Sequence, residues 1–144
     1  MIVSKANEMG GIEPSIGLAD PAQQKRLSPS AIAAFVNIVN IWSLKDTQAL
    51  GLLGAATPAT LLDWKTENEG STLDQNTLTR ISYLIGIYKA LNICHGQELA
   101  DSWVTLPNQN PIFGGKTPVG YMIENGQPGL AMVRRLLDAR CQGQ

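Results

Sequence analysis

The segment from Leu73 to Cys94 constrains the fold more than any other part of the chain. Apolar side chains recur along it every three or four residues: Leu78, Ile81, Leu84, Ile85, Tyr88 and Leu91. This spacing places them on one face of an α-helix, and that face must be covered by other elements. Thr72 and Gln75 have the spacing of a capping box at its start. The sequence therefore predicts one long helix, half buried, around which the rest of the chain is arranged.

Three pairs of a hydroxyl residue and a proline predict where further helices begin. In Ser28-Pro29, Thr57-Pro58 and Thr117-Pro118, an N-cap side chain precedes a proline suited to the first helical position. With Ser43 as another cap and Gly54 as a left-handed helix end, the expected helices span 29–42, 43–53, 58–65, 97–106, 118–125 and 128–140. No segment shows the alternating pattern of a strand. We expect an all-α fold, a helical bundle with short connections.

The chain divides into three predicted parts. Residues 1–27 contain glycines and prolines without a sustained period and are expected to form an arm or tail. Residues 28–70 hold three helices, and residues 71–144 hold the rest. Of the 144 residues, 44% are hydrophobic and 16% charged, which suits a globular core. The net charge of −1 argues against a protein that coats DNA, because phosphate binding depends on clustered cations.

Residues 44–65 have the outline of a helix-turn-helix, two short helices joined by a turn that holds a glycine. In this interpretation the second helix enters the major groove, and Thr57, Thr60 and Lys65 contact DNA. Lys5, Lys25 and Arg26 of the arm, or a second subunit, would add phosphate contacts. This helix has no arginine and its Asp63 repels phosphate. The alternative is a corner that only fills the core, a role that its leucines and tryptophan suit.

Motifs for catalysis or metal binding are weak. Gly114-Gly115-Lys116-Thr117 resembles the end of a phosphate-binding loop, but Asn110 stands where that loop needs a glycine. A tight turn with Thr117 capping the next helix explains it better. Cys94 and His95 are helical neighbours that point about 100° apart, so they cannot form a nucleophile and its base. We expect no enzyme, no metal site and no cofactor.

The cysteines and the termini bear on the compartment. Cys94 and Cys141 lie far apart in the chain and are expected to be unpaired thiols in a reducing cytosol. Neither a signal pattern nor an apolar run of about 20 residues is present. We therefore expect a cytoplasmic protein.

The ordered combination of motifs in the second half of the chain resembles the Xre/MbcA/ParS family of toxin-binding antitoxins. The residues that carry the resemblance are Arg80 to Leu91, Trp103, Pro107-Asn108, Pro111 to Gly115, Pro118, Met122 and Val133 to Ala139. Leu53-Gly54 and Trp64-Lys65 match the helix-turn-helix portion of that family. The resemblance covers about residues 30–140.

The resemblance implies a type II antitoxin, all-helical and dimeric, with an Xre-like helix-turn-helix lobe for operator DNA and a C-terminal lobe for the toxin. Residues 28–70 and 71–144 would be those lobes. The partner would be a RES-domain toxin that consumes NAD, inhibited because the antitoxin covers its active site. The antitoxin would need no cofactor.

Carried onto this chain, the resemblance implies a loop and a helix that face the toxin. The expected toxin-binding residues are Asn108, Pro111, Phe113, Gly114, Gly115, Arg134, Arg135 and Asp138. Phe113 is a candidate anchor, because buried aromatic side chains often dominate the energy of an interface, and its replacement by alanine is expected to weaken binding without unfolding. Its alternative role is that of a core residue that folds the loop down. For the arginines, the alternative is a solvated helix end.

Other functions remain open at this level. The main alternative is a DNA-binding transcriptional regulator without a cognate toxin. Another is an antitoxin-like scaffold that only forms oligomers.

Overall fold

The computed structural model describes residues 18–54, 56–66 and 72–141. Its α-helices are α2 (Pro21–Ile41), α3 (Asp46–Leu53), α4 (Pro58–Lys65), α5 (Gln75–Cys94), α6 (Gln97–Ser102) and α7 (Pro118–Cys141), with 3-10 turns η1 (Trp103–Thr105) and η2 (Pro111–Phe113). No strand occurs in these residues. The all-α prediction is confirmed.

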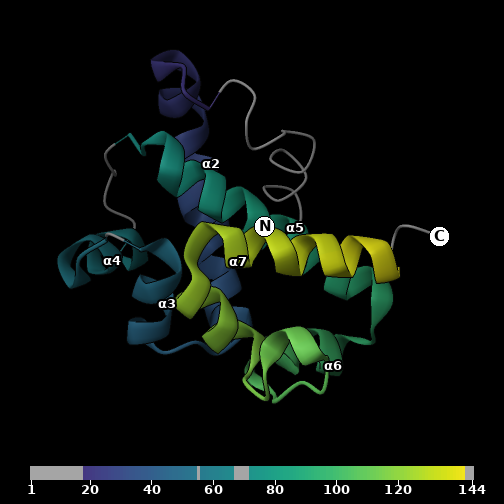
Figure 1. The fold of residues 1–144 in the computed structure, drawn as a ribbon. Helices are drawn as coiled ribbons and strands as arrows, with labels where there is room; N and C mark the ends of the chain where they lie inside the picture. Colours follow the sequence, from purple (N-terminus) through teal and green to yellow (C-terminus); the bar gives the residue numbers. More distant parts are fainter. Residues whose placement is uncertain (1–17, 55, 67–71, 142–144) are drawn as a thin grey trace.

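Helix α5 lies at the centre of the molecule, with α2 packed on one side and α7 along the other. Helices α3 and α4 form one end, and α6 with the loop after it lies beneath α5 and α7 (Figure 1). Eleven residues of α5 are buried, including Leu78, Ile81 and Leu84, as the periodicity predicted. Because α5 is covered by both neighbours, it joins the N-terminal and C-terminal helices into one core.

Helix α2 begins earlier than predicted. Its N-cap is Asp20, whose carboxylate accepts a hydrogen bond from the Ala22 N–H (3.2 Å), and Pro29 lies inside the helix. The Ser28 hydroxyl donates to the Gln24 carbonyl (2.5 Å) and accepts from the Leu73 N–H (2.7 Å). The prediction that Ser28 starts the helix is wrong, because its side chain joins α2 to the segment before α5 instead of capping. Residues 18–27 therefore belong to the folded part, and residues 1–17 of the predicted arm lie outside the described residues.

Two other predicted caps are also displaced. Asp74, not Thr72, caps α5, and its carboxylate accepts from the Thr77 N–H (2.8 Å). Ser43 has a φ of +56° and precedes α3, which begins after Lys45. In both places a neighbouring residue has the extended backbone that an N-cap requires.

The predicted signals around α4 and α7 are confirmed. Thr57 accepts from the Thr60 N–H (3.2 Å), and Thr117 accepts from the Gly120 N–H (3.1 Å). Gly54 ends α3 as predicted, but its φ of +90° and ψ of −57° lie outside the left-handed helical region that the sequence predicted. At Gly126 (φ +65°) a kink divides α7 into the two halves that the sequence predicted as separate helices.

Cys94 and Cys141 are joined by a disulfide in the structure, with Cα atoms 5.0 Å apart. The prediction of unpaired thiols is wrong, because the last residues of α5 and α7 come together although 47 positions separate them in the sequence. None of the described helices is long and apolar enough to cross a membrane. The described residues also hold no group of three or more potential metal ligands.

Candidate functional site

The loop between η1 and α7 is shaped by hydrogen bonds within itself. The Asn108 side chain accepts from the Asn110 N–H (2.9 Å), and the Asn110 side chain accepts from the Ile112 N–H (3.1 Å). The Asn108 N–H donates to the Lys116 carbonyl (3.4 Å), which closes the loop. Asparagine side chains stabilise turns in this way. Asn108 therefore holds the loop together and is half buried.

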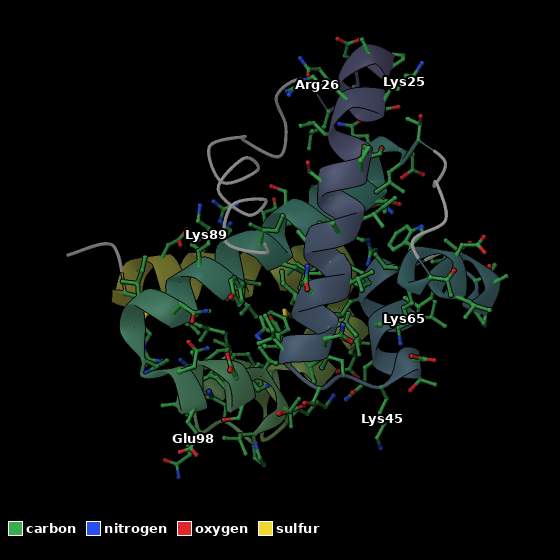
Figure 2. The ribbon with its side chains drawn as sticks, turned by 180° about the vertical axis from the view of Figure 1, so that it is seen from behind. Lys25, Arg26, Lys45, Lys65, Lys89 and Glu98 are labelled. Atoms are coloured by element: carbon green, nitrogen blue, oxygen red, sulfur yellow. A yellow bond between two sulfur atoms is a disulfide. The ribbon has the colours of Figure 1, made fainter. Side chains whose placement is uncertain are left out.

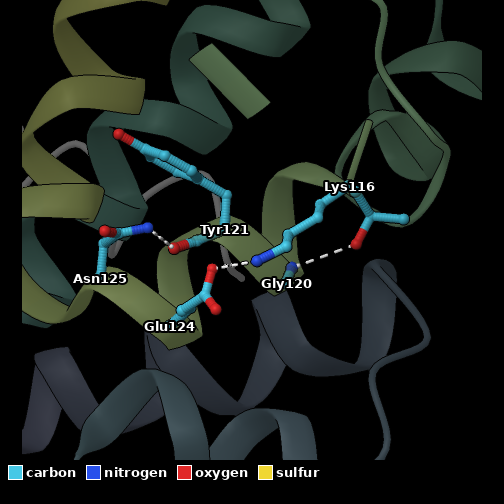
Figure 3. Close-up of polar contacts among 6 residues, drawn as sticks. Lys116, Gly120, Tyr121, Glu124 and Asn125 are labelled. Carbon is cyan, nitrogen blue, oxygen red and sulfur yellow. Dashed lines mark hydrogen bonds and ion pairs between the residues drawn. The ribbon is translucent and has the colours of Figure 1, made fainter. Parts of the chain in front are cut away.

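The far end of the loop turns at two glycines. Gly114 and Gly115 have φ of +56° and +85°, a region that favours glycine, and an added Cβ at either would meet no atom within 4 Å. Lys116 forms an ion pair with Glu124 in the first half of α7. Figure 3 shows this pair beside the hydrogen bond that caps α7 at Gly120. The loop is thus anchored while its glycine end is open to solvent.

Phe113 is buried beneath this loop, with 1% of its surface exposed. Its ring packs edge-on against Trp103 (centroids 6.0 Å apart) and against Tyr121 (5.3 Å). Of its two predicted roles, the structure supports the core residue, because an anchor for a partner must be exposed before binding. Any effect of Phe113 on binding would pass through the shape of the loop.

Most of the exposed large apolar side chains belong to the second half of the chain. Within the described residues, six large hydrophobic side chains are exposed: Leu62, Ile93, Leu99, Leu106, Ile112 and Met132. Five of the six follow residue 90. Leu106 (46% exposed) and Ile112 (37%) stand on either side of the turn formed by Asn108 and Asn110. The sequence did not lead us to predict Leu106 and Ile112 as contact residues. Both stand beside prolines in a polar loop, and this position could have indicated that they are exposed.

The predicted residues of α7 lie beyond the kink, in its second half. Arg134 is half buried across α5, where an added Cβ at Gly86 would lie 2.5 Å from its Nε. It also pairs with Asp138, at 3.6 Å from Nε to Oδ2. Arg135 is exposed. The loop packs on the first half of α7 through Tyr121. One predicted group of toxin-binding residues therefore lies beside the first half of the kinked helix, and the other lies on its second half (Figure 1).

The predicted DNA-binding residues have partners within the protein. Thr57 and Thr60 bond each other through their hydroxyls (3.1 Å). Lys65 pairs with Asp46 of α3 at 2.6 Å. Figure 2 shows Lys65 near Lys45, whereas Lys25 and Arg26 lie at the opposite end of the molecule. Lys25 lies sixteen residues before the last residue of α2, which corresponds to about 24 Å along the helix axis.

The second half of the chain defines the class of protein. Residues 90–143 match the model of the antitoxin Xre/MbcA/ParS C-terminal toxin-binding domain. The chain belongs to this family, as the resemblance of its loop and final helix predicted, and it carries an antitoxin's toxin-binding domain. The exposed apolar side chains after residue 90 all lie within the matched region.

Similarity to one curated relative extends over nearly the whole chain. The uncharacterized protein y4oB of Sinorhizobium fredii (strain NBRC 101917 / NGR234) is 32% identical over 132 residues, which is 91% of this chain and 98% of the relative. No solved structure matches the chain.

Proposed function

We propose that this protein is the antitoxin of a type II toxin–antitoxin system, and that it neutralises a NAD-consuming RES-domain toxin by covering its active site. The observation that carries the proposal is the concentration of exposed apolar side chains inside the toxin-binding domain. Burial of exposed apolar side chains against a partner favours association. The chain would act by binding, without catalysis and without a cofactor, in the cytoplasm.

The contact surface that we propose is the loop shelf, defined as Leu106, Pro111, Ile112, Gly114 and Gly115. All five residues are exposed, and Asn108 with Phe113 holds the shelf in shape from beneath. A surface that is ordered before binding loses less entropy on association. The glycines add a stretch of backbone without side chains, which a partner can approach closely. Arg135 on α7 would supply a charged contact at the rim.

Co-expression tests this function. The toxin encoded beside this gene should arrest growth alone, and co-expression of the antitoxin should restore growth and give a complex that survives size-exclusion chromatography. Absence of both growth rescue and a complex would refute the proposal. A variant with Ile112→Asp should lose rescue, and Leu62→Asp, which changes an exposed leucine outside the matched domain, should keep it.

We further propose that the protein forms a homodimer that binds operator DNA and represses its own operon. Support comes from α3 and α4, two helices of eight residues joined by a turn at Gly54 in the manner of a helix-turn-helix. Thr57, Thr60 and Lys65 would be the contacts, after Lys65 leaves its surface pair with Asp46. Such exposed pairs contribute less than about 1 kcal/mol. A regulator of this kind without a toxin is the second candidate function.

Operator binding has a clear signature. Affinity for a DNA fragment of the protein's own promoter should fall steeply with salt, because bound cations release counterions from DNA. Lys65→Ala should weaken binding, and Lys89→Ala, on α5, should leave it unchanged. If the protein does not shift the promoter fragment in a gel even at low salt, both autorepression and the alternative function, a DNA-binding regulator without a toxin, are refuted.

A further inference from the structure

The carboxyl ends of the two longest C-terminal helices meet at one point of the molecule. Cys94 is the last residue of α5, and Cys141 is the last residue of α7. Their Cα atoms are 5.0 Å apart, inside the range that a disulfide needs without movement of the backbone. The pair is therefore formed by the packing of two helices and not by a flexible segment.

Cys94 is exposed to solvent, and Cys141 is half buried. A thiol at the surface is open to attack by small oxidants and reductants, whereas a buried structural thiol is inert. Cys94 is therefore accessible to a small thiol or disulfide while the protein stays folded.

The segment fastened by this bond is the end of the toxin-binding domain. After the kink, α7 is held on α5 by Leu130, Val133 and Leu137, which are all buried. Among the described residues after Leu137, none is fully buried. Helix ends with little burial open readily. The bond at Cys141 thus fixes the last turn of α7, which follows Arg135 along the same helix.

We propose that Cys94 and Cys141 form a redox latch, a reversible disulfide that holds the end of α7 on α5 and so tunes the binding of the toxin. The link to the toxin rests on the function proposed above.

The oxidant is a low-molecular-weight disulfide, glutathione disulfide. The Cys94 thiolate attacks one of its sulfurs and releases one glutathione thiol. The Cys141 thiolate then attacks the Cys94 sulfur and releases the second. Two protein thiols are oxidised, one glutathione disulfide is reduced, and two glutathione molecules reverse the reaction.

Oxidation strengthens toxin binding in this proposal. The latched helix end is ordered before association, so less entropy is lost when the complex forms. We expect the reduced protein to bind the toxin about tenfold more weakly. In the reduced protein, one or two side chains and a helical turn must become ordered on binding, and this ordering costs free energy.

Hydrogen exchange tests the latch without the toxin. The full-length protein is oxidised with glutathione disulfide or reduced with dithiothreitol, and alkylation with iodoacetamide followed by intact mass counts free thiols. Amides of residues 134–141 should exchange at least tenfold faster in the reduced protein, whereas amides of residues 81–88 in the middle of α5 should not change. Cys141→Ser, and separately Cys94→Ser, should show the fast rate in both conditions. Equal rates in the oxidised and reduced proteins would overturn the latch.

Titration calorimetry with the toxin encoded by the neighbouring gene tests the regulatory half. Tighter binding by the oxidised protein, lost in Cys141→Ser, supports it. Equal affinity of the two forms, with exchange rates that differ, would overturn the regulation while leaving the latch. A toxin that binds neither form would refute the proposed function and the regulation, and the exchange result would still decide the latch.

Discussion

Among single side chains, Phe113 most clearly connects the core to the candidate surface. It is enclosed by Trp103 and Tyr121, so Phe113→Ala leaves a cavity beneath the loop. The free energy of unfolding should fall by about 3–5 kcal/mol. Urea denaturation followed by tryptophan fluorescence measures it. The matched variant Ile112→Ala changes an exposed neighbour and should cost less than about 1 kcal/mol. A Phe113 variant with undiminished stability would show that the ring is not part of the core.

Asp74 stabilises the central helix through its charge. Hydrogen bonds from Thr77, first from its backbone N–H and then from its hydroxyl, lower the pKa of the Asp74 carboxyl, against a smaller opposing effect of burial. Replacement by alanine should cost about 0.5–2 kcal/mol, the usual effect of losing an N-cap.

The lowered pKa also fixes the pH dependence of this contribution. Because the folded-state pKa lies below that of the unfolded chain, the stabilisation is present above the unfolded value of about 3.9 and is lost as the pH falls through the folded value. Asp74→Asn keeps a capping oxygen without the titration. The difference in melting temperature between the wild type and Asp74→Asn should be smaller at pH 3 than at pH 7. A constant difference at both values would contradict this account.

For the helices, the contact of α5 with α7 depends on a glycine. Gly86 lies beneath Arg134, and an added Cβ would lie 2.5 Å from the arginine Nε. Gly86→Ala should push the end of the Arg134 side chain off α5, and because that side chain is flexible and alanine favours the helix, the net loss of stability should stay below about 1 kcal/mol. Removing the obstructing side chain in the double variant Gly86→Ala/Arg134→Ala should recover part of that loss.

A double-mutant cycle in urea measures the coupling between these two positions. Gly96→Ala is the control, because an added Cβ there meets no atom within 4 Å. Additive effects of the two substitutions would show that Arg134 moves aside freely.

The sequence predicted where the helices lie, but it did not predict the first residue of several of them correctly. Periodicity identified α5, and the Thr57 and Thr117 caps were located correctly because each hydroxyl meets an N–H three residues ahead. Ser28 carries the same signal as Thr57. Its hydroxyl bonds the Leu73 N–H, 45 positions away, and a local pattern cannot contain that partner. The pairing of Cys94 with Cys141 was missed for the same reason.

Over the entire chain, the N-terminal and C-terminal helices share one core. Arg80 of α5 donates to the Leu52 carbonyl at the end of α3 (3.1 Å). Its guanidinium also lies against Gly54, and an added Cβ at Gly126 in the kink of α7 would lie 3.5 Å from it. The turn of the helix-turn-helix and the kink of the toxin-binding helix thus contact the same side chain.

The candidate site was only partly predictable. Its loop was identified from prolines, glycines and asparagines, since these residues specify turns locally. Which side chains face outward depends on tertiary packing. Phe113 and Ile112 are neighbours in sequence, yet one is enclosed by two aromatic rings and the other is exposed. An exposed surface can therefore be assigned only after the fold is known.

The most direct measurement of the central claim is the affinity of the neighbouring gene's toxin for this chain and for three variants, by titration calorimetry. Each variant is first shown to be folded by circular dichroism. We expect tight binding by the wild type and by Leu62→Asp, and a loss of at least 100-fold, about 2.7 kcal/mol, for Ile112→Asp and Leu106→Asp. Equal affinity of all four proteins would contradict the assignment of the loop shelf, and absence of binding by the wild type would contradict the antitoxin function itself.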